Sequence, residues 1–329
     1  VAGWFLLARM YLNAQTWINE NKYQEAYAYA VKVIADGHYP LASDYREIFL
    51  ADNNTCKEII WPLVQDGLRA QSSAGTNFYV KAFVNGPMDE LYKTGVGSRG
   101  WGNVRAKVSL VDAFDADDVM FDGNDTWGNN KKDKRAQFMT ALPNQVKDTW
   151  DVNMDMTSTF TCGYGYIKWR NVTKEDELCP SGDAYTSIDF PLFRTADAYL
   201  MAAEAILRGA NGTQSEALGY VNEVRTRAYM SGKYAKNGVR SDVSGEITAN
   251  ELNLDFLLVE RQKELASELT RRTDLIRFGK YTKGNNWDWK NGVRLGADVD
   301  DKYNLFPIPE SELTNNPTLV QNDGYKVIK

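Results

Sequence analysis

The chain has 329 residues, a net charge of −6 and a hydrophobic fraction of 43%, which are ordinary values for a globular protein. The negative charge disfavours a nucleic-acid partner. No apolar run reaches the roughly 18 residues that a membrane-spanning helix needs. The single histidine, His38, stands before Tyr-Pro in a turn-like setting. We therefore expect neither a histidine-dependent catalytic triad nor a histidine-rich metal site.

The three cysteines, Cys56, Cys162 and Cys179, include no Cys-x-x-Cys pair. Redox and metal-binding interpretations are therefore weak. Cys162 and Cys179 flank one loop-like segment, so a disulfide outside the cytoplasm and two buried free thiols are equally open. We expect no cofactor and no metal.

Residues 3–35 predict two helices separated by the polar stretch "NENK" at 19–22. Apolar and small side chains recur along both segments at helical spacing. Each segment therefore has one face suited to burial.

The stretch "DFPLFRTADAYLMAAEAILRGAN" at 189–211 predicts a further, mostly apolar helix. Asp189 and Pro191 suit its start, and "GAN" suits its end. Arg194 and Asp197 are three residues apart and share one face, where they can pair. The apolar stripe of the same segment contains small residues, which favour the close approach of a second helix.

Two segments far apart in the sequence resemble each other. "ARMYLNA" at 8–14 matches "ADAYLMA" at 196–202, and "EAYAYAVKVIA" at 25–35 matches "EALGYVNEVRT" at 216–226. Alternating small and aromatic positions over about 34 residues are typical of a tetratricopeptide-type helical hairpin. Such hairpins bury their faces against neighbours. We expect both hairpins to belong to one scaffold.

The segment between the hairpins, residues 40–188, is rich in Gly, Asn and Asp. Strand-like runs occur at 58–64, 77–83 and 164–172, and one helix is expected at 107–114. The rest is predicted to be loops, and long irregular loops in a compact protein are often functional.

Residues 250–281 show helical stripes of leucine together with dense charges. Buried charges are usually paired. We therefore expect Asp197 to pair with Arg194, or Glu204 to pair with a basic residue of 261–277.

The predicted fold is mainly α, a tetratricopeptide-like helical-hairpin scaffold with a large loop-rich insertion that carries short strands. One domain covers 1–329. Within it we expect a scaffold at 1–39 and 189–281, a ligand-binding insertion at 40–188, and an extended, proline-broken tail at 282–329.

Three long motifs carry a family resemblance. They are "FPLFRTADAYLMAAEA", "ERQKELASELTRRTDLIRFGKY", and "LFPIPESEL" followed by "NPTLVQNDGY". The shorter stretches "LLARMYLNA", "AYAVKVIADGHYPL" and "DKRAQFMT" fit as well. On these motifs the chain resembles the SusD/RagB family, the surface glycan-binding lipoproteins of Bacteroidetes, over nearly its whole length.

The resemblance implies a non-catalytic glycan-binding subunit of an outer-membrane uptake system. It also implies a SusC-like TonB-dependent transporter as partner, packed against a superhelix of four helical repeats in which the charges of 189–211 are structural. Members of the family are anchored to the cell outer membrane by a lipidated cysteine. That cysteine and the family's N-terminal helical region are not seen in this sequence, so we interpret the chain as the C-terminal two-thirds of such a protein.

A polysaccharide or oligosaccharide ligand would stack its rings on aromatic faces and pair its hydroxyls with polar side chains. Trp101 lies between Gly100 and Gly102, which offer it no packing neighbours, and is the first candidate. The other candidates are aromatic or polar residues nearby or in similar loops: Tyr79, Trp127, Trp287 and Trp289, with Asp66, Arg69, Asn77, Arg99, Asn103 and Arg105.

Two alternatives remain open, a glycoside hydrolase with paired carboxylates and a structural lid without its own ligand affinity. The acids of 112–125, or Glu90, would serve the hydrolase; we expect no catalytic residue. The same acidic loop invites a calcium interpretation, but Val119 occupies the place of a third ligand counted from Asp115. A solvated acidic loop is favoured.

Overall fold

The computed structural model describes residues 1–84, 93–119, 127–128, 130–140, 164–230, 243–284, 293 and 296–326. The chain forms two compact units, Val1–Glu268 and Leu269–Lys329. This division does not test the predicted boundaries at 39, 188 and 281.

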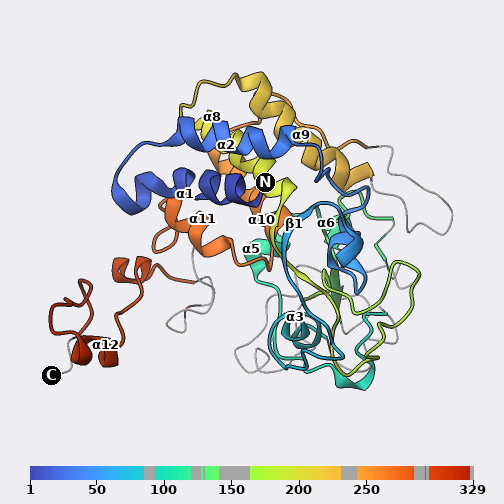
Figure 1. The fold of residues 1–329 in the computed structure, drawn as a ribbon. Helices are drawn as coiled ribbons and strands as arrows, with labels where there is room; N and C mark the ends of the chain where they lie inside the picture. The colour runs from blue at the N-terminus through green and yellow to red at the C-terminus, as the bar shows by residue number, and fades with distance from the viewer. Residues whose placement is uncertain are drawn as a thin grey trace. The chain divides into compact units, whose positions relative to one another are not determined.

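The helices of the first unit confirm the two predicted hairpins. Helix α1 (Ala2–Ile18) is followed by α2 (Tyr23–Ala35), and α8 (Thr195–Leu207) by α9 (Gln214–Met230). The four helices lie side by side, although 159 residues separate Ala35 from Thr195 in the sequence (Figure 1). Helix α10 (Leu254–Leu265) packs on α8. The mainly helical class predicted from the sequence is confirmed.

Small residues let these helices approach closely. Ala8 of α1, Ala26 and Ala30 of α2, and Ala202 of α8 are fully buried in one core cluster. At the edge of this cluster the ring of Phe5 stacks on Phe193 at 4.6 Å. The matched residues Ala26 and Ala217 are both fully buried, so the sequence repeat corresponds to equivalent packing positions.

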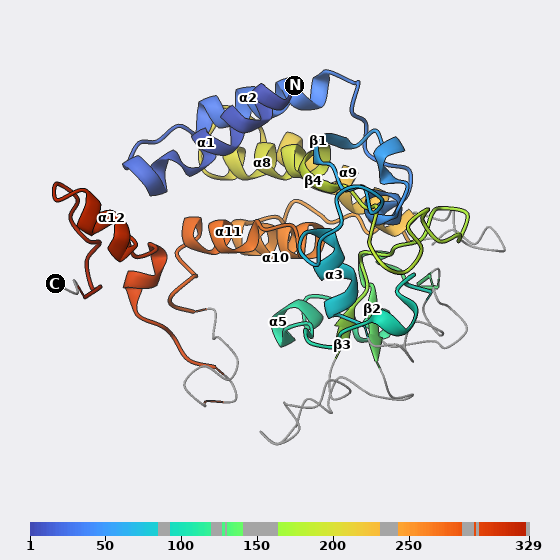
Figure 2. The same cartoon turned by 60° about the horizontal axis from the view of Figure 1, so that its bottom comes forward.

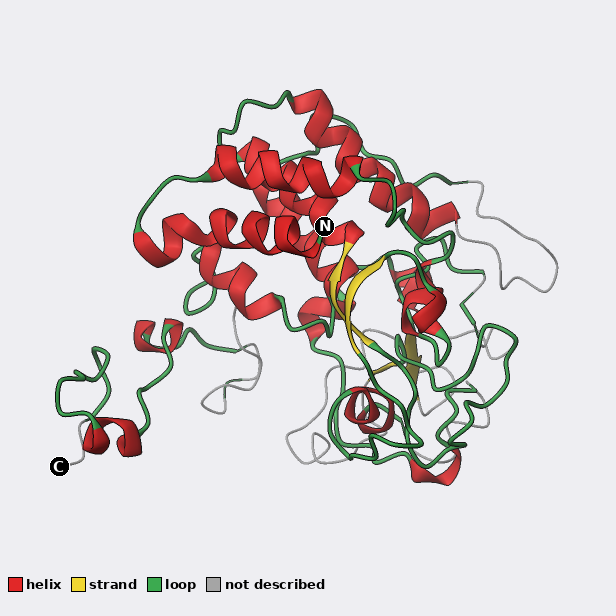
Figure 3. Ribbon diagram, viewed as in Figure 1, coloured by secondary structure: helices red, strands yellow, loops and turns green. Residues whose placement is uncertain are grey.

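The insertion forms the second layer of this unit, beside the helices (Figures 2 and 3). Two antiparallel pairs of strands, β1 with β4 and β2 with β3, connect its loops. Its elements are η1 (Tyr45–Phe49), η2 (Asn53–Thr55), β1 (Ile59–Leu63), α3 (Thr76–Ala82), η3 (Gly97–Arg99), α5 (Val108–Val111), α6 (Ala116–Val119), β2 (Phe138–Thr140), β3 (Tyr164–Tyr166) and β4 (Phe190–Arg194).

Three secondary-structure predictions need correction. Residues 77–83 were expected as a strand, but α3 is a helix that buries Asn77, Val80 and Lys81 at helical spacing. Residues 189–194 were expected to start a helix, but Phe190–Arg194 is strand β4, because it pairs with β1. The strand expected at 164–172 ends at Tyr166.

An aromatic cluster fills the core of the insertion. The indole of Trp169 is fully buried, stacks on Phe190 at 5.6 Å and meets Phe49 edge-on at 4.9 Å. Tyr79 of α3 stacks on two rings of this cluster. Its ring centroid lies 5.4 Å from that of Trp169 and 5.9 Å from that of Phe190. Helix α3 is thereby fixed to β4 through its aromatic side chain.

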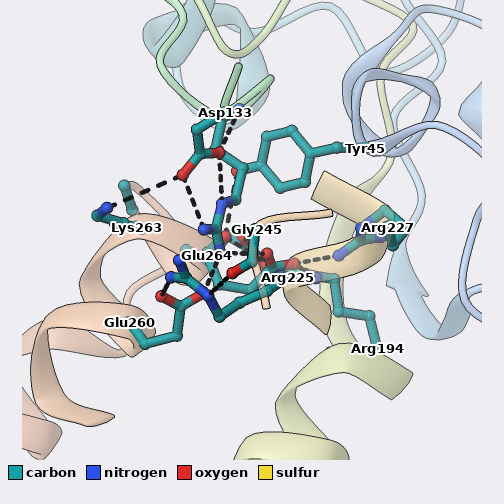
Figure 4. A network of polar contacts seen from close by, with 12 residues as sticks. Tyr45, Asp133, Arg194, Arg225, Arg227, Gly245, Glu260, Lys263 and Glu264 are labelled. Carbon is teal, nitrogen blue, oxygen red and sulfur yellow. Dashed lines mark hydrogen bonds and ion pairs between the residues drawn. The ribbon is translucent and has the colours of Figure 1, made fainter. Parts of the chain in front are cut away.

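Buried ion pairs join the insertion to the helical scaffold (Figure 4). Arg194, at the end of β4, donates to Glu58 at 2.9 Å, to Glu264 of α10 at 2.7 Å and to Glu268 at 2.6 Å. Arg227 of α9 also contacts both Glu58 and Glu264. The side chains of these five residues are nearly or fully inaccessible to solvent.

The same network continues along α10. Glu260 accepts from Arg135 and from Arg225, each at 2.6 Å, and Arg135 also binds Asp133 through two nitrogens at 2.8 Å. Lys263 lies 3.9 Å from Asp133 at the border of the network. We call the set Glu58, Asp133, Arg135, Lys168, Arg194, Arg225, Arg227, Glu260, Glu264 and Glu268 the buried charge network.

The electrostatics of the network favour ionised carboxylates. Burial on its own would raise the pKa of Glu264, but Arg227, Arg194 and Arg135 outweigh it and lower the pKa to about 2. Burial lowers the pKa of Lys168 to about 8, despite its contact with Glu268 at 2.5 Å.

The predicted pair of Arg194 and Asp197 is wrong, because Arg194 points into the buried charge network. Asp197 instead accepts from Arg9 of α1 and Arg261 of α10, each at 2.8 Å. Glu204 accepts from Arg208 at 2.8 Å, and Arg261 lies 3.9 Å from it. The side chains of Arg194, Asp197 and Glu204 are therefore buried and paired, as a structural role requires.

The second unit contains α11 (Arg271–Arg277), η6 (Asp301–Asn304) and α12 (Glu310–Asn315). Residues 282–329 were expected to be extended, and η6 and α12 are two short helical turns within them. Arg272 connects its segments, because its guanidinium lies 4.1 Å from the ring of Phe306 and donates to the carbonyl of Tyr303 at 2.9 Å. Within the described part of the chain, no helix is long and apolar enough to cross a bilayer.

Candidate functional site

The loop that carries Trp101 is fastened to the C-terminal end of α3. The last carbonyls of a helix lack partners within the helix. Here the amide of Trp101 donates to the carbonyl of Lys81 at 2.8 Å, and the amides of Asn103 and Val104 donate to that of Ala82 at 2.8 and 2.9 Å. The loop therefore satisfies the helix end and is held in place by it.

A cavity of about 430 Å³ lies where this loop, α3 and residues 184–185 meet. We call it the Trp101 cavity. Most of its lining side chains are polar or aromatic, and the lining residues are Ser73, Asn77, Lys81, Ser98, Arg99, Gly100, Trp101, Ala184 and Tyr185.

Trp101 offers an open aromatic face at this cavity. Its side chain is 37% exposed although indole is strongly apolar. The ring of Phe78, also exposed, lies 6.2 Å away at an angle of 59°. Gly102 has a φ of 57°, in the left-handed region where a glycine fits without strain, so the backbone turns directly after Trp101.

Two cations line the cavity. Arg99 donates from Nε to Asp183 at 3.0 Å. Lys81 donates from Nζ to the carbonyl of Ala184 at 2.5 Å, and its Nζ lies 5.8 Å from the ring centroid of Tyr185. Burial, followed by the nearby charge of Arg99, lowers the pKa of Lys81 below its ordinary value.

Asn77 lines the same cavity. Its Nδ2 donates to the carbonyl of Ser72 at 3.0 Å, whereas its Oδ1 is buried without a hydrogen-bond partner. An unpaired buried carbonyl costs about 1–3 kcal/mol. Because this oxygen is inaccessible to solvent, it is not a contact for a ligand in this structure.

Four predicted residues lie close to the cavity without lining it. Asn103 is exposed and Arg105 is half-buried, both on the extended segment after Trp101. Asp66 and Arg69 form an exposed ion pair at 2.9 Å across a turn. That turn lies against the cavity wall, because Gly67 packs on the carbonyl of Tyr185.

Two aromatic candidates pack against other side chains and do not line the Trp101 cavity. Trp127 is 7% exposed, and the guanidinium of Arg170 lies 4.5 Å from its ring centroid. Tyr79 is half-buried and belongs to the aromatic cluster around Trp169. Both remain predicted ligand contacts. Trp287 and Trp289 lie outside the described residues.

The sequence pattern did not reveal Lys81 or Tyr185 as part of the site. Asn77 and Lys81 are four residues apart, so a helix places both on one face. In the strand expected at 77–83 the two residues would also share a face, but they would lie about 13 Å apart. Tyr185 reaches the cavity from a segment more than 80 residues away, and no local pattern indicates that proximity.

The described lining of the cavity contains no carboxylate, whereas glycoside hydrolysis requires two. Glu90 and part of the acidic loop, including Asp122 and Asp125, lie outside the described residues. Within the part that is described, no cluster of metal-ligating side chains occurs. Cys179 is a buried free thiol, and Cys162 is outside the described residues.

Stacked helical hairpins joined to a loop-rich layer, with an aromatic and polar cavity in that layer, define a helical-repeat protein with a cavity-bearing insertion. The family model "SusD family" matches residues 57–325, and the chain belongs to the SusD family. The family predicted from the sequence motifs is thereby confirmed.

Individual relatives agree with this assignment. The chain is 33% identical to the starch-binding protein SusD of Bacteroides thetaiotaomicron, over 99% of this chain and 60% of the relative. It is 25% identical to SusD-like protein P25 of Formosa agariphila, over 95% of this chain and 57% of that protein. The chain thus spans about three-fifths of the length of these relatives.

Solved structures share the fold. Surface glycan-binding protein A of Bacteroides thetaiotaomicron, in complex with laminarihexaose, superposes with a TM-score of 0.61 at 22% identity. The match covers 96% of this chain and 62% of that one. A SusD-like protein of Bacteroides fragilis gives a TM-score of 0.64 at 20% identity, over 98% of this chain and 65% of the other.

Proposed function

We propose that this chain is a non-catalytic glycan-binding subunit of an outer-membrane system that takes up polysaccharides or oligosaccharides. The observation that carries the proposal is the partly exposed indole of Trp101 at a cavity whose other lining side chains are mostly polar. An aromatic ring and polar side chains suit the two surfaces of a sugar, its C–H face and its hydroxyl groups.

The relatives support this choice of ligand class, since one is named a starch-binding protein and another is a surface glycan-binding protein in complex with a glucan oligosaccharide. The proposed site is Trp101 with Asn77, Lys81, Arg99 and Tyr185, and Asn103, Arg105, Asp66 and Arg69 extend it at the rim. Binding without cleavage is proposed, because the described lining holds no pair of carboxylates.

Family membership supports the remaining parts of the proposal. The partner is a SusC-like TonB-dependent transporter, and the protein is displayed at the cell surface as a lipid-anchored protein of the outer membrane. Pull-down of a transporter of this class with the tagged protein from solubilised outer membranes tests the partner. Recovery of the protein only from the soluble fraction of the cell contradicts the location.

Affinity gel electrophoresis tests ligand binding. The wild-type chain is run in gels that contain a panel of polysaccharides, beside Trp101→Ala and the control Trp17→Ala, which removes a 57% exposed tryptophan of α1. We expect at least one polysaccharide to retard the wild type and the control but not Trp101→Ala. Equal retardation of all three proteins contradicts the site.

Incubation with oligosaccharides separates the two alternatives. Release of shorter products identifies a hydrolase, and absence of retardation by every glycan tested identifies a lid without its own affinity.

A further inference from the structure

The charge of the Trp101 cavity is opposite to that of the chain. The whole protein carries a net charge of −6, yet the described lining residues include two cations and no acid. Asp183 neutralises one charge through its ion pair with Arg99. The group of Lys81, Arg99 and Asp183 therefore contains two cationic side chains and one carboxylate, a formal charge of +1.

Lys81 is 5% exposed, and no described carboxylate lies within ion-pairing distance of its Nζ. Asp183, which pairs with Arg99, acts on Lys81 only as a more distant charge. The contacts of Lys81 are the carbonyl of Ala184 and the ring of Tyr185. A buried ammonium without a counter-ion is unfavourable unless another negative group reaches it. An ammonium has three N–H donors, so donors remain after the bond to Ala184.

Arg99 has further donors at the same cavity. Its bond to Asp183 uses Nε, and its side chain is 56% exposed. The terminal amino groups of a guanidinium suit the oxygens of a carboxylate or a sulfate, with which they form charge-assisted hydrogen bonds.

A second cavity of the insertion has a different composition. It measures about 340 Å³, and among its lining residues two acids, Glu47 and Asp52, face two lysines, Lys57 and Lys174. Its described lining has no aromatic ring. The excess of positive charge, together with an open indole face, is thus a property of the Trp101 cavity.

We propose that the glycan bound at the Trp101 cavity is acidic. Lys81 and Arg99 hold its anionic group, the carboxylate of a uronic acid or a sulfate ester. A sugar ring stacks on Trp101. This inference rests on the proposed glycan-binding function and specifies its ligand class.

Matched pairs of polysaccharides test the proposal in affinity gels at physiological ionic strength. Polygalacturonate and alginate are each compared with their carboxyl-reduced forms, which keep the backbone and lose the charge. Dextran sulfate is compared with dextran, so the two kinds of anionic group are separated. We expect one acidic polymer to bind at least about tenfold more tightly than its neutral partner, the equivalent of about 1.4 kcal/mol.

Variants of Lys81 test whether the preference for acidic polymers arises at the Trp101 cavity. Lys81→Gln keeps a hydrogen-bond donor and removes the charge, so it is expected to weaken binding of the acidic polymer about tenfold. Lys81→Arg keeps the charge and is expected to retain binding. Lys57→Gln, at an exposed lysine of the second cavity, is the control and is expected to bind like the wild type.

The outcomes separate this inference from the proposed function. Equal binding of the acidic and neutral partners, or wild-type binding by Lys81→Gln, overturns the inference. Trp101-dependent binding of neutral glycans alone overturns it while the proposed function stands. Absence of binding to every polymer overturns both. If the Lys81 variants do not fold, a sodium chloride titration of the wild type decides, because binding of an acidic glycan must weaken with salt.

Discussion

The buried charge network and the Trp101 cavity lie in the same unit but differ in how their charged side chains are paired. In the network, Arg194 is shared among Glu58, Glu264 and Glu268 at 2.6–2.9 Å. In the cavity, Lys81 meets one backbone carbonyl, and Oδ1 of Asn77 meets no donor. In the network each carboxylate is paired with a cation, whereas Lys81 has no described carboxylate as an ion-pair partner.

This difference distinguishes structural from ligand-facing polar groups better than burial does. Arg194 and Lys81 are both buried. Charges that are paired with one another connect structural elements. An ammonium that lines a cavity and keeps unused N–H donors is available to a ligand.

The largest expected effect is on the network. Arg194→Met removes the shared cation and leaves three carboxylates of the network short of a partner. Such a loss lowers the free energy of unfolding by about 3–5 kcal/mol. Urea unfolding measures this free energy. Arg69→Ala is the control, because its side chain is 89% exposed, and is expected to change stability by less than about 0.5 kcal/mol. Similar small changes for both variants would show that the network does not stabilise the fold.

Acid should weaken the ion pairs of the buried charge network. The pKa of Glu264 is about 2 in the folded chain against an ordinary 4.5, so its stabilisation is complete above pH 4.5 and is lost as the pH falls toward 2. The shift corresponds to about 3 kcal/mol. Thermal melting between pH 6 and pH 3, compared with Glu264→Gln, measures the loss. Equal slopes for wild type and variant would contradict the shift.

A pair of aromatic substitutions should distinguish core from cavity. Tyr79→Ala removes a ring that stacks on Trp169 and Phe190, and is expected to cost about 3 kcal/mol. Trp101→Ala is expected to cost less than about 1 kcal/mol, because its ring is partly exposed. Denaturant midpoints measure both values. A larger loss for Trp101→Ala would place that ring in the core.

The smallest effect on stability, and a gain in binding, is expected for Asp183→Asn. An exposed ion pair contributes roughly 0–1 kcal/mol, so the fold should tolerate the loss of the pair with Arg99. The variant frees Arg99 and removes a negative charge near Lys81. Calorimetry with an acidic oligosaccharide is expected to show tighter binding than in the wild type. Weaker binding would mean that Asp183 orients Arg99 for the ligand.

The helical scaffold could be predicted from the sequence because its signals are local and long. The hairpins at 3–35 and 193–228 repeat small residues at helical spacing, and the buried pair Ala26 and Ala217 shows that the spacing reflects packing. The partners of the charges could not be predicted in the same way. Arg194 reaches Glu264 and Asp197 reaches Arg9, over 70 and 188 residues.

The candidate site was predicted in part. Trp101, Arg99 and Asn77 line one cavity. The glycines that flank Trp101 were the sequence signal for that residue. Tyr79 and Trp127 are covered by side chains distant in the sequence, so their burial had no local signal. Lys81 was missed because α3 is a short helix of residues with strand propensity, and its helical face becomes clear only in the tertiary structure.

Fluorine NMR of the protein labelled with 5-fluorotryptophan tests the central claim most directly. The chain has nine tryptophans, and a Trp101→Phe variant assigns the resonance of interest. On titration with a glycan that retards the protein, we expect the Trp101 resonance to shift and those of the buried Trp127 and Trp169 to stay in place. Saturation of binding with an unchanged Trp101 resonance would contradict the account, because the ligand would then occupy another site.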